Sequence, residues 1–256
     1  WNTPIGATPA LEADSQALIN AFRNSSPFGE HLDVNIARFS IPLYQATSGT
    51  PLQSVATNLG GEGWGQGGPG AVGTMPIPPG ARPDDSFDAH MAVLSADRTK
   101  EYGCWAMNFN GTRAGAWYAQ LCATSALTGS GVRPPANTAN PWWSAHGARA
   151  CGFPLVAGLI RADEIRAGRI DHALVFAYPA LRKNRFTPPA STNSSDGADY
   201  GIPCGGRIQF DPSIDVTKLG LSPAGVTIMR ALQQYGAYVG DYSGALSMYA
   251  DNSPDA

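Results

Sequence analysis

The sequence predicts an all-β fold, a β-sandwich or jelly roll with two or three short peripheral helices. The 30 glycines and 21 prolines are scattered without a period, as in turn-rich β proteins. Short apolar or alternating segments recur along the chain, whereas few stretches have helical spacing. No repeat or composition break divides the chain. We therefore expect one domain over residues 1–256, with residues 1–83 as a strap and glycine-rich loop that wrap the core.

The N-terminal part predicts one helix, two strand regions and two irregular segments. Residues 12–23 carry apolar side chains at helical spacing, and residues 34–43 alternate as a strand does. Residues 43–56 continue as an irregular strand pair. Residues 60–70 contain too many glycines for a regular element. Residues 75–83 resemble polyproline and form a stiff lead into the next strands.

The C-terminal part predicts further strands and two helices. One helix covers residues 161–167 and is closed by Gly168. The other begins with Ser222 as a cap and Pro223 in its first turn, and runs to about Tyr235. Apolar or alternating runs predict strands over residues 114–123, 170–178, 205–210 and 237–241.

A central hairpin organises the candidate site. Residues 87–95 and 100–107 read as two strands joined by a four-residue polar loop. Because side chains alternate along a strand, pairing Ser95 with Lys100 places four functional side chains on one face. These are Asp88, His90, Glu101 and Trp105. The opposite face is apolar, so the first face is the candidate site.

This face suits glycoside hydrolysis, which needs two carboxyl groups on either side of a glycosidic bond. Asp88 and Glu101 are the candidate pair, His90 would orient one of them, and Trp105 would form the floor under a sugar ring. The same residues also fit a simpler interpretation, in which both carboxylates are solvated and His90 is a hydrogen-bonded structural residue.

A polysaccharide lyase is the alternative enzyme, because it needs a base and a group that neutralises a uronate. His90 or His172 would be the base, and Arg207 with Gln209 would bind the uronate. A third alternative is a carbohydrate-binding protein without catalysis, in which the aromatic residues bind sugar and the carboxylates accept hydrogen bonds from its hydroxyl groups. A structural coat or matrix protein is a fourth.

The segment PWWSAHGAR adds two aromatic candidates, since Trp142 and Trp143 could stack on sugar or pack within a loop. Ser144 and His146 do not suggest a hydrolase triad, because no G-x-S-x-G motif surrounds the serine. An Asp-x-His pair with a distant histidine could also bind metal, although this spacing is generic.

The four cysteines lack the spacing of a zinc ribbon and therefore favour two disulfides in a secreted, extracellular protein. Among three connectivities we prefer Cys104–Cys122 with Cys151–Cys204. The net charge of −3 does not favour nucleic acid or an anionic membrane as a partner. We expect a monomer that takes a polysaccharide and needs no cofactor, with a structural calcium ion left open.

Six segments resemble a widespread group of secreted bacterial proteins, largely actinobacterial. They are WNTPI, MPIPPGARPDD with DAHMAV, EYGCW, LVAGLIRADEIRAGRIDHAL, RIQFDPS and RALQQYGAYVGD. The resemblance covers most of the chain from Trp1 to Asp241. It implies an extracellular, carbohydrate-related context and transfers no catalytic residues. The sequence thus predicts a secreted β protein that acts on a polysaccharide, with glycoside hydrolysis as the leading reaction.

Overall fold

The computed structural model describes residues 1–6, 8–28, 31–61, 63–65, 67–108, 116–135 and 145–252. Within these residues the chain forms two large sheets, a two-stranded sheet and three short α-helices. The predicted all-β class with few helices is therefore confirmed. Both large sheets are mixed, since each contains parallel as well as antiparallel pairs.

The first large sheet uses the chain between residues 43 and 126. Its strands, in spatial order, are β2 (Leu43–Gln45), β5 (Met91–Leu94), β6 (Lys100–Trp105), β7 (Trp117–Ala126), β3 (Leu52–Gly60) and β4 (Val72–Pro76). One of its faces covers a buried cluster that includes Trp64, Met75 and Met91. The indole of Trp64 donates to the Val55 carbonyl oxygen, so this loop tryptophan packs on its own scaffold.

The second large sheet combines strands from both ends of the chain. In spatial order they are β1 (Leu32–Asn35), β13 (Leu246–Tyr249), β8 (Leu174–Tyr178), β12 (Ala237–Tyr242) and β11 (Arg207–Ile208). The small sheet pairs β9 (Arg182–Phe186) with β10 (Pro203–Cys204). The helices are α1 (Ser15–Arg23), α3 (Ala162–Ala167), α4 (Pro223–Gln234) and the 3-10 helix η1 (Val216–Lys218).

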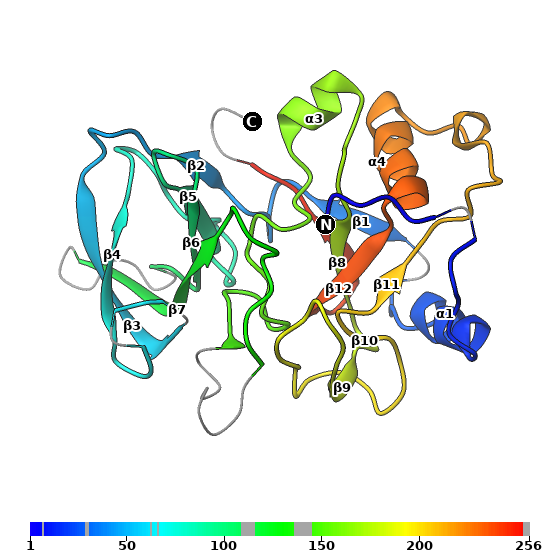
Figure 1. Ribbon diagram of the computed structural model, residues 1–256, viewed down its shortest axis with the longest axis horizontal. Helices are drawn as coiled ribbons and strands as arrows, with labels where there is room; N and C mark the ends of the chain where they lie inside the picture. The colour runs from blue at the N-terminus through cyan, green and yellow to red at the C-terminus, as the bar shows by residue number, and fades with distance from the viewer. Residues whose placement is uncertain are drawn as a thin grey trace.

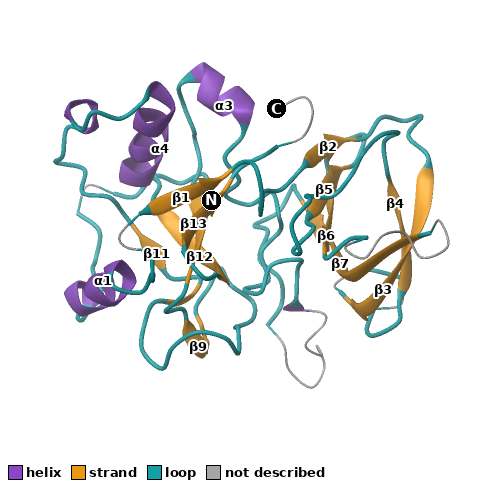
Figure 2. Cartoon of the chain, turned by 180° about the vertical axis from the view of Figure 1, so that it is seen from behind, coloured by secondary structure: helices purple, strands orange, loops and turns teal. Residues whose placement is uncertain are grey.

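The two large sheets lie beside each other, and the α-helices surround only the second (Figures 1 and 2). A shared apolar cluster joins the sheets. It contains Ala92 and Leu121 from the first sheet and Val175 from the second, with Phe153 and Leu155 from the segment that connects them. This packing brings the ends of several strands from both sheets to one junction.

The central hairpin forms with the predicted register. Met91 pairs with Cys104, Val93 with Tyr102 and Leu94 with Glu101. The short loop fixes this register locally, because the Ser95 amide donates to the Lys100 carbonyl oxygen at 2.9 Å. The helix ending at Gly168, which has φ = 70°, is also confirmed, as is the helix capped by Ser222. 

Other elements differ from the prediction. Residues 1–83 form more than a strap and a loop. They contain α1 and contribute four strands, β1 to β4, to the two large sheets. The expected strand over residues 34–43 is instead split between β1 and β2. The chain bends at Phe39, whose φ is 55°, because the Asp84 carboxylate accepts the amides of Phe39 and Ser40. Strand β13 was not predicted from the sequence.

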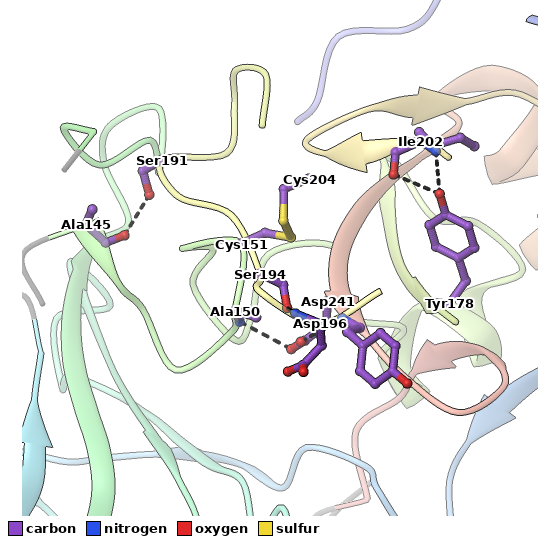
Figure 3. Close-up of a disulfide and its surroundings, with 11 residues drawn as sticks. Ala145, Ala150, Cys151, Tyr178, Ser191, Ser194, Asp196, Ile202, Cys204 and Asp241 are labelled. Atoms are coloured by element: carbon purple, nitrogen blue, oxygen red, sulfur yellow. Dashed lines mark hydrogen bonds between the residues drawn. A yellow bond between two sulfur atoms is a disulfide. The ribbon is translucent and has the colours of Figure 1, made fainter. Parts of the chain in front are cut away.

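Both disulfides have the preferred connectivity. Cys104 and Cys122 join the paired strands β6 and β7. Cys151 and Cys204 join the segment that follows β7 to strand β10, across 53 residues (Figure 3). No helix in the described part of the chain is long and apolar enough to cross a membrane.

Asp84 holds the bend at Phe39 in place. It also accepts hydrogen bonds from the Ser40 hydroxyl and from the amide and hydroxyl of Ser86. Burial opposes ionisation, but these hydrogen bonds outweigh it and lower the pKa of Asp84. The carboxylate therefore contributes stability above its unfolded pKa, and that stability is lost as the pH falls through the lower folded pKa.

We expect Asp84→Ala to destabilise the fold by about 3 kcal/mol, because several buried donors lose their acceptor. Chemical denaturation at neutral pH measures this difference. The neighbouring Asp85 is exposed and serves as the control, since Asp85→Ala removes a carboxylate without stranding buried donors. Equal stability of the two variants would contradict the structural role of Asp84.

Candidate functional site

A cavity of about 780 Å³ lies where the two large sheets meet. Ligand sites in proteins commonly measure about 300–1,000 Å³. The first sheet contributes Trp105 and Leu121 to its wall, and the second contributes Asp33, Asp241 and Tyr249. Figure 3 shows another part of the wall, where Ala150, Ser194 and Asp196 gather near Asp241 beside the Cys151–Cys204 disulfide.

Asp88 reaches the cavity from the beginning of the central hairpin. Its backbone carbonyl oxygen accepts the Ala106 amide at 2.7 Å, which fixes this residue against the end of β6. Its Oδ1 accepts the Trp105 indole N–H at 3.2 Å. Asp88 and Trp105 thus share a site as predicted, and both line the cavity. The predicted strand over residues 87–95 is shorter, however, because β5 begins at Met91 and the chain turns at Ala89, whose φ is 37°.

Asp241 lines the same cavity from the second sheet, and its carboxyl group interacts with the negative charge of Asp88. It lies in β12 where the pairing with β8 shifts register, and such bulges redirect side chains. Its Oδ1 accepts the Tyr242 amide at 2.9 Å, and its Oδ2 accepts the Ala150 amide at 3.4 Å (Figure 3). Burial, reinforced by the negative charge of Asp88 and opposed by Arg149, raises the pKa of Asp241 to about 6.

His90 lies next to this carboxyl pair and is almost completely buried, with 3% of its surface exposed. Burial and the positive charge of Arg149 lower the pKa of His90 to about 4, against the opposing charge of Asp88. The imidazole is therefore neutral at neutral pH. The Ala148 backbone lies close, but neither ring nitrogen reaches hydrogen-bonding geometry with any described residue.

Arg149 completes the charged group and was not singled out in the sequence. Its guanidinium lies 4.1 Å from the centre of the Tyr249 ring, and its Nη2 donates to the Leu155 carbonyl oxygen at 3.0 Å. The side chain is 1% exposed, and burial lowers its pKa. Nearby, burial and the charge of Arg133 lower the pKa of His146, which also lines the cavity.

Glu101 lies on the predicted face but not in the cavity wall. The chain around Leu155 covers it, and its Oε1 accepts the amides of Leu155 at 2.7 Å and Val156 at 3.4 Å. Burial raises the pKa of Glu101 despite the nearby charges of Arg133 and Arg149. Asp88 and Asp241 both line the cavity, whereas Glu101 does not, so Asp241 rather than Glu101 is the candidate partner of Asp88.

The glycan hydrolysis that the sequence predicts should be unchanged in Glu101→Gln, because Glu101 does not line the cavity. The substitution should also make the protein relatively more stable as the pH rises above about 4.5. Because the folded pKa is raised, the wild type loses stability as the pH increases through the unfolded pKa, and glutamine removes this loss. Thermal unfolding between pH 4 and pH 7 measures the difference. Loss of hydrolysis in a folded Glu101→Gln protein would return Glu101 to the candidate site.

The other histidine and polar candidates lie elsewhere. His172 lines a second cavity of about 610 Å³, where its Nδ1 donates to the Ala173 carbonyl oxygen and its Nε2 lies 3.0 Å from Glu164. Arg207 donates from Nε to the Tyr235 carbonyl oxygen at 2.8 Å. Gln209 donates to the Gln233 carbonyl oxygen at 2.7 Å. These contacts give all three side chains structural partners away from the junction cavity.

Trp142 and Trp143 lie outside the described residues. Within the described residues, no group of three or more histidine, cysteine, aspartate or glutamate side chains is arranged to hold a metal ion. Sequence reasoning missed Asp241 and Arg149. Asp241 ends an apolar strand pattern, which is a weak signal for a site, and nothing in the sequence around Arg149 indicates its burial. Comparisons with protein-family models, curated proteins and solved structures find no match to this chain.

Proposed function

We propose that the protein is a secreted glycoside hydrolase that cleaves a polysaccharide with Asp88 and Asp241. The observation that carries this proposal is that Asp88, from the turn before β5, and Asp241, from β12 of the second sheet, line one cavity, with the pKa of Asp241 raised to about 6. Enzymes of this class need one carboxyl group that is protonated near neutral pH and one that is ionised.

The environments of the two carboxyl groups assign their roles. Asp241 is the general acid and gives its proton to the glycosidic oxygen as the bond to the anomeric carbon breaks. Asp88 is the carboxylate on the other side of the bond, where its Oδ1 is held by the Trp105 N–H. It either removes a proton from the attacking water or bonds to the anomeric carbon first, and the anomeric form of the product distinguishes the two.

Aromatic side chains at the cavity rim support a sugar as the ligand. Phe28 and Phe87 are 70% and 57% exposed, and Tyr242 is 42% exposed. The Phe87 ring lies 5.1 Å from the Phe39 ring, and all four side chains line the cavity. Exposed aromatic surfaces beside a cavity that contains carboxyl groups offer flat apolar faces on which a sugar ring stacks.

The two disulfides support secretion, because disulfides persist in oxidising compartments. The resemblance to secreted bacterial proteins with a carbohydrate-related context supports the same location. A polysaccharide lyase is the second candidate, and its support is now the neutral His90 beside Arg149 rather than His172 or Arg207. In that reaction His90 removes a proton from the carbon next to the uronate carboxylate.

Digestion of a broad polysaccharide panel tests the proposal. Reducing ends and ultraviolet absorbance are measured together, because hydrolysis creates only reducing ends whereas a lyase also creates an absorbing double bond. We expect reducing ends to rise without absorbance for at least one glycan. Absorbance that rises with the reducing ends would replace the hydrolase by the lyase. Binding without turnover would leave a carbohydrate-binding protein.

Phe87→Ala is expected to raise KM for the cleaved glycan about 5- to 10-fold, with little change in kcat, through loss of a stacking surface. Initial rates across substrate concentrations measure both constants. Phe186 is also exposed but does not line the cavity, so Phe186→Ala is the matched control. An unchanged KM in Phe87→Ala would exclude stacking at this rim.

A further inference from the structure

Arg149 carries hydrogen-bond donors that the protein leaves unused. Its Nη2 donates to the Leu155 carbonyl oxygen, but its Nε and Nη1 have no acceptor among the described residues. No carboxylate in the described chain approaches the guanidinium closely enough for an ion pair, although Asp241 and Glu101 act on it from farther away. A buried donor without an acceptor costs about 1–3 kcal/mol. These nitrogens have almost no accessible surface, so an occupant of the cavity supplies the acceptor once a small side-chain movement exposes them.

We propose that Arg149, together with His90, forms a subsite for the carboxylate group of an acidic sugar. Both side chains line the cavity that contains Asp88 and Asp241, and both are almost completely buried. The inference rests on the proposed function, which it deepens by naming the substrate class. The glycan would carry a uronate or another carboxylated sugar beside the bond that is cleaved.

The geometry of the donors favours a carboxylate over other groups. The guanidinium of arginine is a planar fork whose paired N–H groups match the two oxygens of a carboxylate. In Arg149 such a pair combines either free nitrogen, Nε or Nη1, with the second N–H of Nη2, whose other N–H is available for Leu155. His90 as a neutral imidazole carries a single ring N–H. The Ala148 backbone interacts with it, but neither nitrogen has a partner in full hydrogen-bonding geometry, so this N–H can turn to a ligand. A hydroxyl group of a neutral sugar cannot accept from both arms of the fork in this way and brings no negative charge to the buried cation.

The negative charges around the cavity favour a monoanion. Asp33, Asp88, Asp196 and Asp241 line the same cavity, so a phosphate group with up to two charges is repelled more strongly than a carboxylate with one. Arg149 supplies one buried positive charge against these four carboxyl groups, which reduces the repulsion of a single negative charge without cancelling it. The inferred ligand is therefore a sugar carboxylate rather than a sugar phosphate.

Paired ligands test the subsite. Tetrasaccharides of galacturonate, glucuronate and mannuronate are each compared with their carboxyl-reduced counterparts, which differ only in the carboxylate. Calorimetry with Asp241→Asn protein measures binding while cleavage is blocked. We expect at least one acidic member to bind about 10-fold or more tightly than its reduced partner, the effect of a charge-assisted hydrogen-bond pair.

Arg149 variants assign any preference to this side chain. Arg149→Lys keeps the positive charge but loses the fork, and is expected to reduce the preference for the acidic member. Arg149→Met is expected to abolish it. Arg161 lines the other cavity, so Arg161→Lys is the control that should retain it. Circular dichroism and thermal unfolding establish that each variant is folded. If an Arg149 variant does not fold, kcat/KM of the wild type for the two members of each pair still measures the preference for the carboxylate.

Three outcomes would overturn the subsite. They are equal or tighter binding of the neutral member in every pair, a preference that survives in folded Arg149→Met protein, and the absence of binding by every acidic member. Cleavage of a neutral glycan that Asp241→Asn abolishes would leave the hydrolase in place while removing the carboxylate subsite. Binding of acidic members by the wild type without any turnover would leave the carboxylate subsite in place while removing the hydrolase.

Discussion

Asp241→Asn is expected to lower kcat/KM for glycan hydrolysis on the order of 10³-fold, the contribution typical of a positioned general acid. The asparagine retains an oxygen that accepts from the Tyr242 amide, so the fold should not change. Asp88→Asn is expected to cause a loss of similar size, because it removes the carboxylate on the other side of the glycosidic bond. Initial rates with the glycan identified in the panel measure both effects.

The pH dependence separates the two carboxyl groups. Because Asp241 acts in its protonated form and its pKa is about 6, the rate should fall about tenfold per pH unit above that value. Asp171 is exposed and bound to Arg169 at 2.8 Å on the surface, so Asp171→Asn is the control and should keep the wild-type profile. Residual hydrolysis by Asp241→Asn with an unchanged high-pH limb would exclude Asp241 as the acid.

Removal of the Cys151–Cys204 disulfide is expected to destabilise the protein by about 4 kcal/mol, from the entropy of the long loop that it closes. The bond also holds the segment that carries His146 and Arg149 against the second sheet, where the Cys151 amide donates to the Gly240 carbonyl oxygen at 3.2 Å. The paired substitution Cys151→Ala with Cys204→Ala should therefore lower glycan binding as well as stability.

The other disulfide provides the comparison. Cys104 and Cys122 close a shorter loop and lie opposite each other in paired strands, so their removal should cost about 3 kcal/mol. It should also leave the cavity residues in place, because the pairing of β6 with β7 holds the adjoining cavity residues Trp105 and Leu121 without the bond. Denaturation and calorimetry of both double variants measure the contrast. Equal losses of glycan binding per unit of lost stability would contradict a specific role for Cys151–Cys204.

The part of the site that depends on local structure could be predicted from the sequence. A short loop sets the hairpin register, and this register places Glu101 and Trp105 on one face. Asp88 lies before β5, and the turn at Ala89 rather than strand alternation brings it to Trp105. The sequence cannot indicate that the segment around Leu155, which is distant in sequence, covers Glu101 and donates a backbone amide to its carboxyl group.

The part that depends on the arrangement of the two sheets could not be predicted. Asp241 meets the hairpin only because β12 lies inside a sheet assembled from both ends of the chain, and no local pattern specifies that order. Arg149 resembles an ordinary loop arginine until packing buries it against Tyr249. Conversely, His172, Arg207 and Gln209 have the side chains of a site, but neighbouring backbone carbonyl groups engage them.

A crystal structure of Asp241→Asn protein with the oligosaccharide identified in the panel would show where the sugar binds. We expect a sugar chain in the junction cavity, with a glycosidic oxygen within hydrogen-bonding distance of residue 241 and the anomeric carbon beside Asp88. A sugar chain bound at the second cavity near His172, or one whose glycosidic bonds all lie away from Asp88, would contradict this expectation.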